Sequence, residues 1–211
     1  MSYPKGDPGV WLASRLHPGD LVLDVGANVG GCAKHFAAAG ARVMAIEPDA
    51  RCHDELLSSV PSAAIHKMAA AAYVGDADLT LGTQPLHSSL RPQSVLQPAG
   101  TCTVRMTTLD SLAADVNVSA IKVDVQGCEL DVLLGAPRLL FDCPLWVVEI
   151  WPHGFPRQTE TVMDIYRWFE VAQKFPHTLE EPPRLLSYDD LMAWCAIAEP
   201  HSYLNLAWYG D

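Results

Sequence analysis

Apolar and polar positions along the chain follow two alternating patterns. Continuous apolar runs, typical of strands covered on both faces, occur at residues 21–26, 41–49, 119–127 and 144–150. Between them lie segments with apolar residues at helical spacing, such as residues 30–40, where Gly40 ends the pattern. This alternation predicts a single α/β domain over residues 1–211 with a largely parallel sheet.

The remaining segments predict further elements. Helices are expected at residues 10–16, 50–60, 111–116, 128–140, 159–175 and 187–195. Extended segments are expected at residues 63–69, 103–109 and 203–210. Residues 71–82 predict a hairpin that turns at Gly75 and Asp76, and residues 176–186 predict a proline-rich loop. Asp110 and Ser187 are the expected caps of the helices that follow them.

Charge and hydropathy narrow the classes of partner. The chain has 14 Lys and Arg against 25 Asp and Glu, a formal net charge of −11, without a run of basic residues. Such a surface repels a phosphate backbone, so we expect no nucleic-acid partner. Apolar stretches do not reach the length of a membrane span, and the first ten residues lack the apolar core of a signal peptide. We therefore expect a cytoplasmic protein that does not bind a membrane.

The cysteines fit the same compartment. All six are scattered and none forms a CxxC pair. This spacing favours free thiols in a reducing cytosol over a zinc site or a disulfide framework.

The first strand-like run leads into a glycine-rich turn. Asp24 lies in the run, and the turn over residues 26–31 reads GANVGG. Dinucleotides and S-adenosylmethionine both bind at such turns, where glycines let the backbone approach the ligand. Asn28 replaces the second glycine of the dinucleotide fingerprint G-x-G-x-x-G, and the Asp24 carboxylate disfavours a pyrophosphate. The turn therefore favours S-adenosylmethionine, whose amino and sulfonium groups are cationic.

The second strand-like run ends in an acid. Glu47 follows the apolar residues VMAI, 23 positions after Asp24. An acid at the tip of the second strand can accept hydrogen bonds from both ribose hydroxyls. Glu47 therefore predicts a nucleoside-containing ligand, which either cofactor satisfies.

Several segments together carry a family resemblance. They read VLDVGANVGG, AIEPD, TTLDSL, IKVDVQGCELDVLLGA, WVVEI and NLAWYG. In these segments the chain resembles the FkbM family of S-adenosylmethionine-dependent methyltransferases, over nearly its whole length from about Leu21. The resemblance implies a Rossmann-like class I methyltransferase fold, with a mostly parallel seven-stranded sheet, one antiparallel strand and helices on both faces. It also implies methylation of a hydroxyl on a small molecule such as a sugar or polyketide, with S-adenosylhomocysteine as the second product.

The resemblance implies roles for individual residues. The cofactor-binding set that it implies is Asp24, Gly26, Ala27, Asn28, Gly30, Glu47, Pro48, Met68, Ala69 and Asp124. In this set the first-turn residues surround the methionine part, Glu47 and Pro48 hold the ribose, and Met68 and Ala69 flank the adenine. Ser88 and Ser89 resemble a family segment near the mouth of the site. The chain departs from the family at Gln126, where glutamate is common, and at Trp151, where histidine is common.

Methyl transfer to an alcohol also needs a proton acceptor. The candidates are Asp124, Glu149 and His153, with His87 as a weaker one. Asp124 is the first choice because it ends a buried strand at the rim where open parallel sheets bind ligands. Trp151 and Trp168 are candidates for the acceptor wall, although the helical spacing around Trp168 favours the core. We predict no metal, because no third acid is apparent beside Asp124 and Glu149.

Two other functions stay open from the sequence alone. One is an NAD-dependent oxidoreductase that uses the same turn, and the other is a protein that binds S-adenosylmethionine without chemistry. The expected partner is a small hydroxylated acceptor. A homo-oligomer in which a second chain roofs the pocket is also open.

Overall fold

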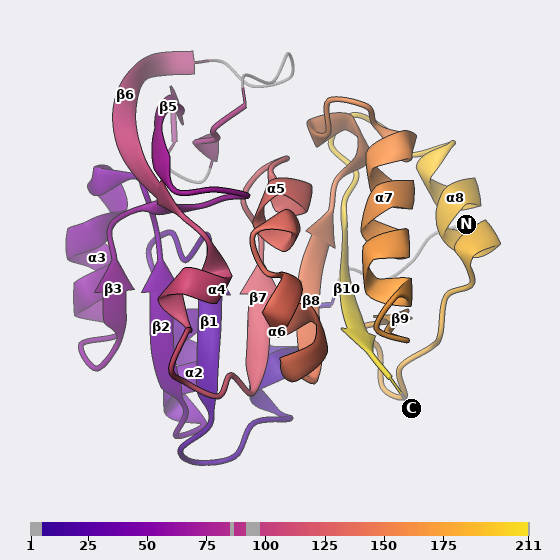
Figure 1. The fold of residues 1–211 in the computed structure, drawn as a ribbon, viewed down its shortest axis with the longest axis horizontal. Coiled ribbons are helices and arrows are strands. Elements are labelled where there is room, and N and C mark those ends of the chain that lie inside the picture. The colour runs from indigo at the N-terminus through magenta and orange to yellow at the C-terminus, as the bar shows by residue number, and fades with distance from the viewer. Residues whose placement is uncertain (1–5, 85–86, 92–97, 211) are drawn as a thin grey trace.

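A computed structural model describes residues 6–84, 87–91 and 98–210, and its centre is a seven-stranded sheet with helices on both faces (Figure 1). From edge to edge the strands are β3 (Ala64–His66), β2 (Arg42–Ile46), β1 (Leu21–Val25), β7 (Ala120–Val123), β8 (Leu145–Ile150), β10 (Leu204–Tyr209) and β9 (Phe175–Thr178). Only β10 runs against its neighbours, β8 and β9. This confirms the predicted sheet with one antiparallel strand.

Each face of the sheet packs against its own set of helices. One core holds α1 (Pro8–Ala13), α2 (Ala33–Ala38) and α3 (His53–Ser59) against residues such as Val22, Val43 and Val147. The other core holds the remaining helices, and Figure 1 shows several of them in front of the strands. Those helices are α4 (Leu109–Leu112), α5 (Glu129–Leu134), α6 (Pro137–Asp142), α7 (Thr159–Glu170) and α8 (Tyr188–Cys195). Burial on both faces explains why the central strands are apolar throughout.

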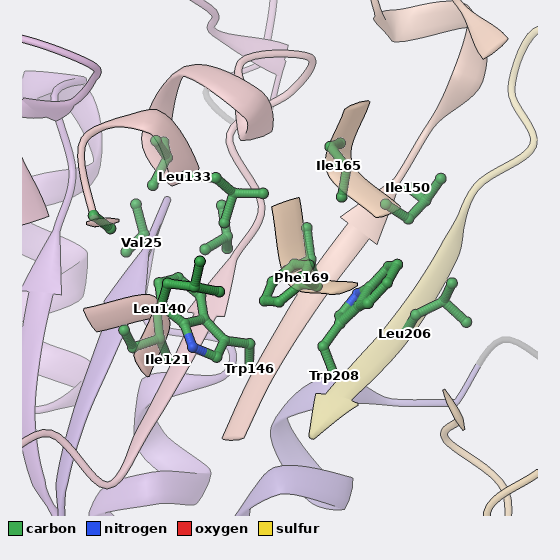
Figure 2. Packing of buried hydrophobic residues seen from close by; sticks show 14 of the residues in the cluster. Val25, Ile121, Leu133, Leu140, Trp146, Ile150, Ile165, Phe169, Leu206 and Trp208 are labelled. Carbon is green, nitrogen blue, oxygen red and sulfur yellow. The ribbon is translucent and has the colours of Figure 1, made fainter. Parts of the chain in front are cut away.

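Aromatic side chains fill the second core. Phe169 of α7 stacks on Trp208 of β10 with ring centroids 4.5 Å apart, and Trp146 of β8 meets Phe169 edge to face (Figure 2). Trp168 packs edge to face against Trp146 at 5.5 Å. Trp168 therefore contributes to the core, as its helical spacing predicted.

A small second sheet replaces the predicted hairpin. Residues 71–82 do not turn at Gly75 and Asp76; instead β5 (Gly75–Gly82) is one strand that pairs along its length with β6 (Pro98–Thr107). The hairpin prediction was wrong because the alternation of apolar residues continues through Ala77, Leu79 and Leu81 into one strand. β4 (Ala69–Ala70) joins the other edge of β6.

Two other predictions are corrected. Residues 128–140 form two helices because Gly135 approaches the Ala71 carbonyl so closely that a Cβ would lie 2.0 Å away, and Pro137 then starts α6. Asp110 caps α6 rather than its own helix, accepting from Arg138 N at 2.7 Å and Leu139 N at 3.1 Å. Thr108 caps α4 instead.

The predicted loop over residues 176–186 begins inside a strand. β9 carries Pro176, which a central strand would not tolerate. It is tolerated here because β9 is the outermost strand of the sheet: β10 pairs with it on one side, and on the other Leu185 forms an isolated bridge with His177. The Ser187 cap of α8 is confirmed, in a capping box with Asp190. Among the described helices, none has both the length and the apolar character needed to cross a bilayer.

Candidate functional site

The main cavity lies at the carboxyl ends of β1, β2, β7 and β8, where open parallel sheets bind ligands. Its volume is about 510 Å³, within the range of small-molecule sites. The strand order places the first turn and the end of β2 on one side, and the ends of β7 and β8 on the other. Apolar residues of the wall include Ile46, Pro48, Ala69, Leu79 and Leu90.

The first turn requires glycine at its start. Gly26 has a φ of 75°, and a Cβ there would lie 1.8 Å from the Asp124 carbonyl oxygen. Its amide and that of Ala27 donate to Ile46 O, which holds the turn over the end of β2. Gly26, Ala27 and Asn28 line the cavity. The backbone of the turn thus faces the cavity on one side. On its other side a Cβ at Gly26 would collide with the carbonyl of Asp124, the residue after β7.

Glu47 is fixed by backbone amides on the cavity wall. Its carboxylate accepts from Asn28 N at 2.8 Å and from Asp49 N at 2.7 Å. The residue is only 6% exposed, and burial raises the pKa of Glu47 to about 7 despite these two amides. Its remaining lone pairs can accept from two ligand hydroxyls. The side chain is therefore placed for a ribose, although this role stays a prediction.

Asp24 does not line the cavity, contrary to the expected contact with the cofactor. Its carboxylate is completely buried, and its ion-pair partner is Lys122, whose Nζ lies 3.2 Å from Asp24 Oδ1. The β1–β7 register aligns the two residues. Lys122 Nζ also donates to Gly26 O at 2.9 Å and lies 3.5 Å from Asp124 Oδ2. One lysine therefore ties together β1, the glycine turn and the end of β7.

Two other expected cofactor contacts lie outside the cavity wall. Gly30 has a φ of 89°, and its missing side chain makes room for Ser59 and Leu56 of α3, so this glycine serves helix packing. Met68 packs against the large core beneath the helices. Pro48 and Ala69 do line the cavity, as do Ser88 and Ser89.

A segment of residues 87–91 crosses the wall and is held at both sides. Ser88 Oγ donates to Asp49 Oδ2 at 2.7 Å and accepts from Arg51 Nη2 at 3.0 Å. Ser89 Oγ donates to Gln126 O at 2.8 Å. The segment therefore connects the end of β2 to the end of β7 across the cavity.

The opposite side of the cavity is acidic and aromatic. Asp124 follows β7, Glu149 lies in β8, and both line the cavity together with Gln126, Trp151, His201 and Tyr203. Gln126 Nε2 donates to Asp124 Oδ1 at 2.9 Å and to Glu149 Oε2 at 3.3 Å. Burial, followed by the charges of Asp124 and Glu129, raises the pKa of Glu149 well above its usual value. Once ionised, Glu149 is therefore a stronger base than a carboxylate with the ordinary pKa.

His153 is not part of this wall. Its Nε2 lies 2.8 Å from Ala198 O in the loop after α8, and the residue does not line the cavity. His87 does line the cavity, as the first residue of the segment that Ser88 and Ser89 hold. Asp124 and Glu149 therefore stay the candidate proton acceptors, whereas His153 does not face the cavity.

A third acid lies beside Asp124 and Glu149, although the sequence did not reveal it. Oxygen atoms of Asp124, Glu129 and Glu149 lie within 4.8 Å of one another. Glu129, however, accepts from Val125 N at 2.9 Å and Gly127 N at 3.0 Å. Its carboxylate thus satisfies the backbone of the loop after β7, and we assign no metal to the cluster.

Sequence reasoning missed Lys122, His201 and Tyr203, and it noted Gln126 only as a departure from the family. Lys122 was visible as the one charged residue in an apolar strand, a signal that a buried partner must exist. His201 and Tyr203 precede a strand distant in sequence and had no comparable signal.

Comparisons with known proteins agree with this geometry. Residues 24–176 match the family described as Methyltransferase FkbM domain. No curated protein sequence matches the chain. The fold is similar to a TehB-like SAM-dependent methyltransferase from Corynebacterium glutamicum, with a TM-score of 0.53, 12% identity, and coverage of 96% of this chain and 86% of the other.

Two further solved structures share the fold. Precorrin-6y C5,15-methyltransferase from Geobacter metallireducens has a TM-score of 0.50 at 8% identity, covering 100% of this chain and 95% of the other. A protein of the NADB-Rossmann superfamily from Streptococcus agalactiae has a TM-score of 0.51 at 12% identity, covering 99% and 70%. At such identities the likeness shows the fold alone.

Proposed function

Since the chain belongs to the methyltransferase FkbM family, we propose that it transfers the methyl group of S-adenosylmethionine to a hydroxyl oxygen of a small molecule. The observation that carries the proposal is the cavity itself. A glycine turn and the Glu47 carboxylate form one side, and the Asp124–Glu149 carboxyl pair forms the other.

The residues present fit this cofactor. Glycine at position 26 lets the turn pack against the Asp124 carbonyl, so that the backbone of Gly26, Ala27 and Asn28 lines the cavity. Glu47 has lone pairs left for ribose hydroxyls after it accepts from two backbone amides. Pro48 and Ala69 provide apolar wall for a nucleoside. When bound, the cofactor supplies an activated methyl group on a cationic sulfur. The carboxylates near Asp124 favour a cation there and disfavour a pyrophosphate, which argues against the NAD-dependent alternative.

The wall also limits the charge of the acceptor. Of the described residues that line the cavity, Lys122 is the single lysine or arginine, and Asp24, Asp124 and Gly26 O already engage its ammonium. A phosphorylated or carboxylated acceptor would meet Asp124 and Glu149 without a free cation. We therefore expect an uncharged acceptor, with Trp151 and Tyr203 as apolar wall and Glu149 as acceptor of the hydroxyl proton.

Cofactor binding gives the first test. At pH 8, where Glu47 is ionised, we expect S-adenosylmethionine to bind more tightly than NAD in isothermal titration. Glu47→Gln should raise the Kd of S-adenosylmethionine about 10- to 100-fold, because a charge-assisted hydrogen bond contributes roughly 1.5–3 kcal/mol. Glu55→Gln, at an exposed position of α3, is the matched control. Tighter binding of NAD would contradict the proposal.

Turnover gives the second test. Purified protein is supplied with S-adenosylmethionine and a panel of small acceptors that differ in one group: a neutral polyol, the same polyol carrying a phosphate, and an amine analogue. We expect S-adenosylhomocysteine to form with the neutral hydroxylated acceptors and not with the phosphorylated ones. Tight cofactor binding without product from any acceptor would instead support a binding protein, and product from amines alone would overturn transfer to oxygen.

A further inference from the structure

Gln126 adopts a backbone conformation that suits glycine better than glutamine. Its φ is 56°, in the left-handed region, and Gly127 after it has a φ of 95°. Residues with a Cβ avoid this region, apart from asparagine and aspartate, whose short side chains can bond locally. The two residues form the sharp turn between β7 and α5. A strained non-glycine residue on a cavity wall indicates that its side chain has a use there.

The side chain of Gln126 points back over this turn to the two carboxyl groups of the acidic wall. Its Nε2 donates to Asp124 Oδ1 at 2.9 Å and to Glu149 Oε2 at 3.3 Å. A primary amide has two N–H groups, so it can serve one carboxyl group with each. The presence of two acceptors places the nitrogen, rather than the amide oxygen, on this side.

The charges around Asp124 and Glu149 explain why a hydrogen-bond donor between these two carboxyl groups is stabilising. Asp124 and Glu149 face one another and Glu129. Burial raises the pKa of Tyr203, and the nearby charges of Glu149 and Asp124 raise it further. Lys122, which itself pairs with the buried Asp24, approaches Asp124 at Oδ2, leaving Oδ1 to Gln126. When both groups are ionised, Asp124 and Glu149 repel one another, and an amide that donates to each of them offsets this repulsion.

We propose that Gln126 is a positioning residue of the methyl-transfer site, whose amide holds the Asp124 and Glu149 carboxyl groups together so that a free oxygen faces the acceptor hydroxyl. This inference rests on the proposed transfer to a hydroxyl. Gln126 itself does not take the proton. It aligns the group that does, and it favours the ionised form of that group by donating hydrogen bonds to it.

Gln126→Gly separates this role from a structural one. Glycine relieves the left-handed strain, so the variant should melt at or above the wild-type temperature and bind S-adenosylmethionine within about threefold of wild type. Its kcat should fall about 10- to 100-fold through loss of alignment. In a plot of kcat against pH, the rising limb of this variant should move to higher pH. The ionised Asp124 and Glu149 carboxylates have lost the hydrogen-bond donor that stabilised them, so the pKa of the base rises.

Two other variants serve as controls. Gln173→Gly changes a second glutamine in the left-handed region, with a φ of 55°, which is exposed and lies in the turn before β9. It should share the thermal effect while keeping wild-type turnover and pH profile. Gln126→Asn keeps an amide and tolerates the left-handed backbone but is one methylene shorter. It should recover the fold fully and the turnover only in part.

A measurement without an acceptor keeps this inference separate from the proposed function. Titration of the Glu149 carboxyl by carbon NMR in the cofactor-free protein should give a higher pKa in Gln126→Gly than in wild type. If the wild-type protein methylates none of the hydroxylated acceptors, the proposed function fails. The titration still tests whether the Gln126 amide holds the Asp124 and Glu149 carboxyl groups. A Gln126→Gly protein with wild-type turnover and an unmoved Glu149 titration would overturn the inference.

Discussion

Replacing Lys122 with methionine is expected to lower the free energy of unfolding by about 3–5 kcal/mol, the range for breaking a buried ion pair from one side. Asp24 is completely buried, and Lys122 is its ion-pair partner. Burial raises the pKa of Asp24. Burial also acts to lower the pKa of Lys122, but the charges of Asp24 and Asp124 outweigh it and raise that pKa. Methionine would leave Asp24 charged without a partner, or force it to take up a proton.

Urea unfolding followed by circular dichroism measures this loss. Lys67→Met, at an exposed position before β4, is the control and should change stability by less than about 0.5 kcal/mol. The double variant Asp24→Leu/Lys122→Met should recover most of the loss, because an apolar pair can replace a buried ion pair. A single Lys122→Met variant as stable as wild type would show that the ion pair does not support the fold.

Replacing Glu149 with glutamine is expected to lower kcat about 10²- to 10⁴-fold, the usual contribution of a general base, while the Kd of S-adenosylmethionine stays within a few-fold. Glu149 is 7% exposed on the cavity wall, next to Asp124. Glutamine has nearly the same shape but cannot accept the proton of the acceptor hydroxyl. Glu160→Gln, on the exposed start of α7, is the matched control.

The pH profile tests the same assignment. A base must be deprotonated to act, and the pKa of Glu149 is raised well above its ordinary value by burial and then by Asp124 and Glu129. We therefore expect kcat to be low at mildly acidic pH and to rise as Glu149 ionises. Asp124→Asn removes one of the charges that raise this pKa, so the rising limb should move to lower pH. An unmoved limb in Asp124→Asn, or wild-type kcat in Glu149→Gln, would remove Glu149 from this role.

Local sequence was sufficient to predict the structure where residues close together in the chain make the deciding contacts with one another. The strand–turn–helix around Gly26 and the acid at Glu47 lie close together in the chain, and the structure joins them through the Asn28 amide. The Ser187 capping box spans only four residues. In such units the deciding interactions are short in sequence, so the pattern of residue types is enough to predict them.

The errors fall where a residue finds its partner far along the chain. Asp24 is turned toward Lys122, which lies in another strand, by the β1–β7 register and not by any nearby residue. Asp110 caps α6, 28 residues further on, instead of its own helix. His153 shares a loop with Trp151 but is held by Ala198 O beyond α8. Neither the periodicity of apolar residues nor the spacing of a short motif indicates any of these pairings.

The sequence by itself determined the alternation of helices and strands that builds most of the central sheet, the glycine turn after β1 and membership of the methyltransferase FkbM family, because apolar periodicity and short motifs are local properties. Only the tertiary structure decided which carboxyl groups meet. Asp124 directly follows β7, and Glu149 lies in the neighbouring parallel strand β8. The Gln126 amide donates to both carboxyl groups, and Glu129 of the following helix lies beside them. The raised pKa of Glu149 depends on that burial and proximity, and both exist only once the sheet has assembled.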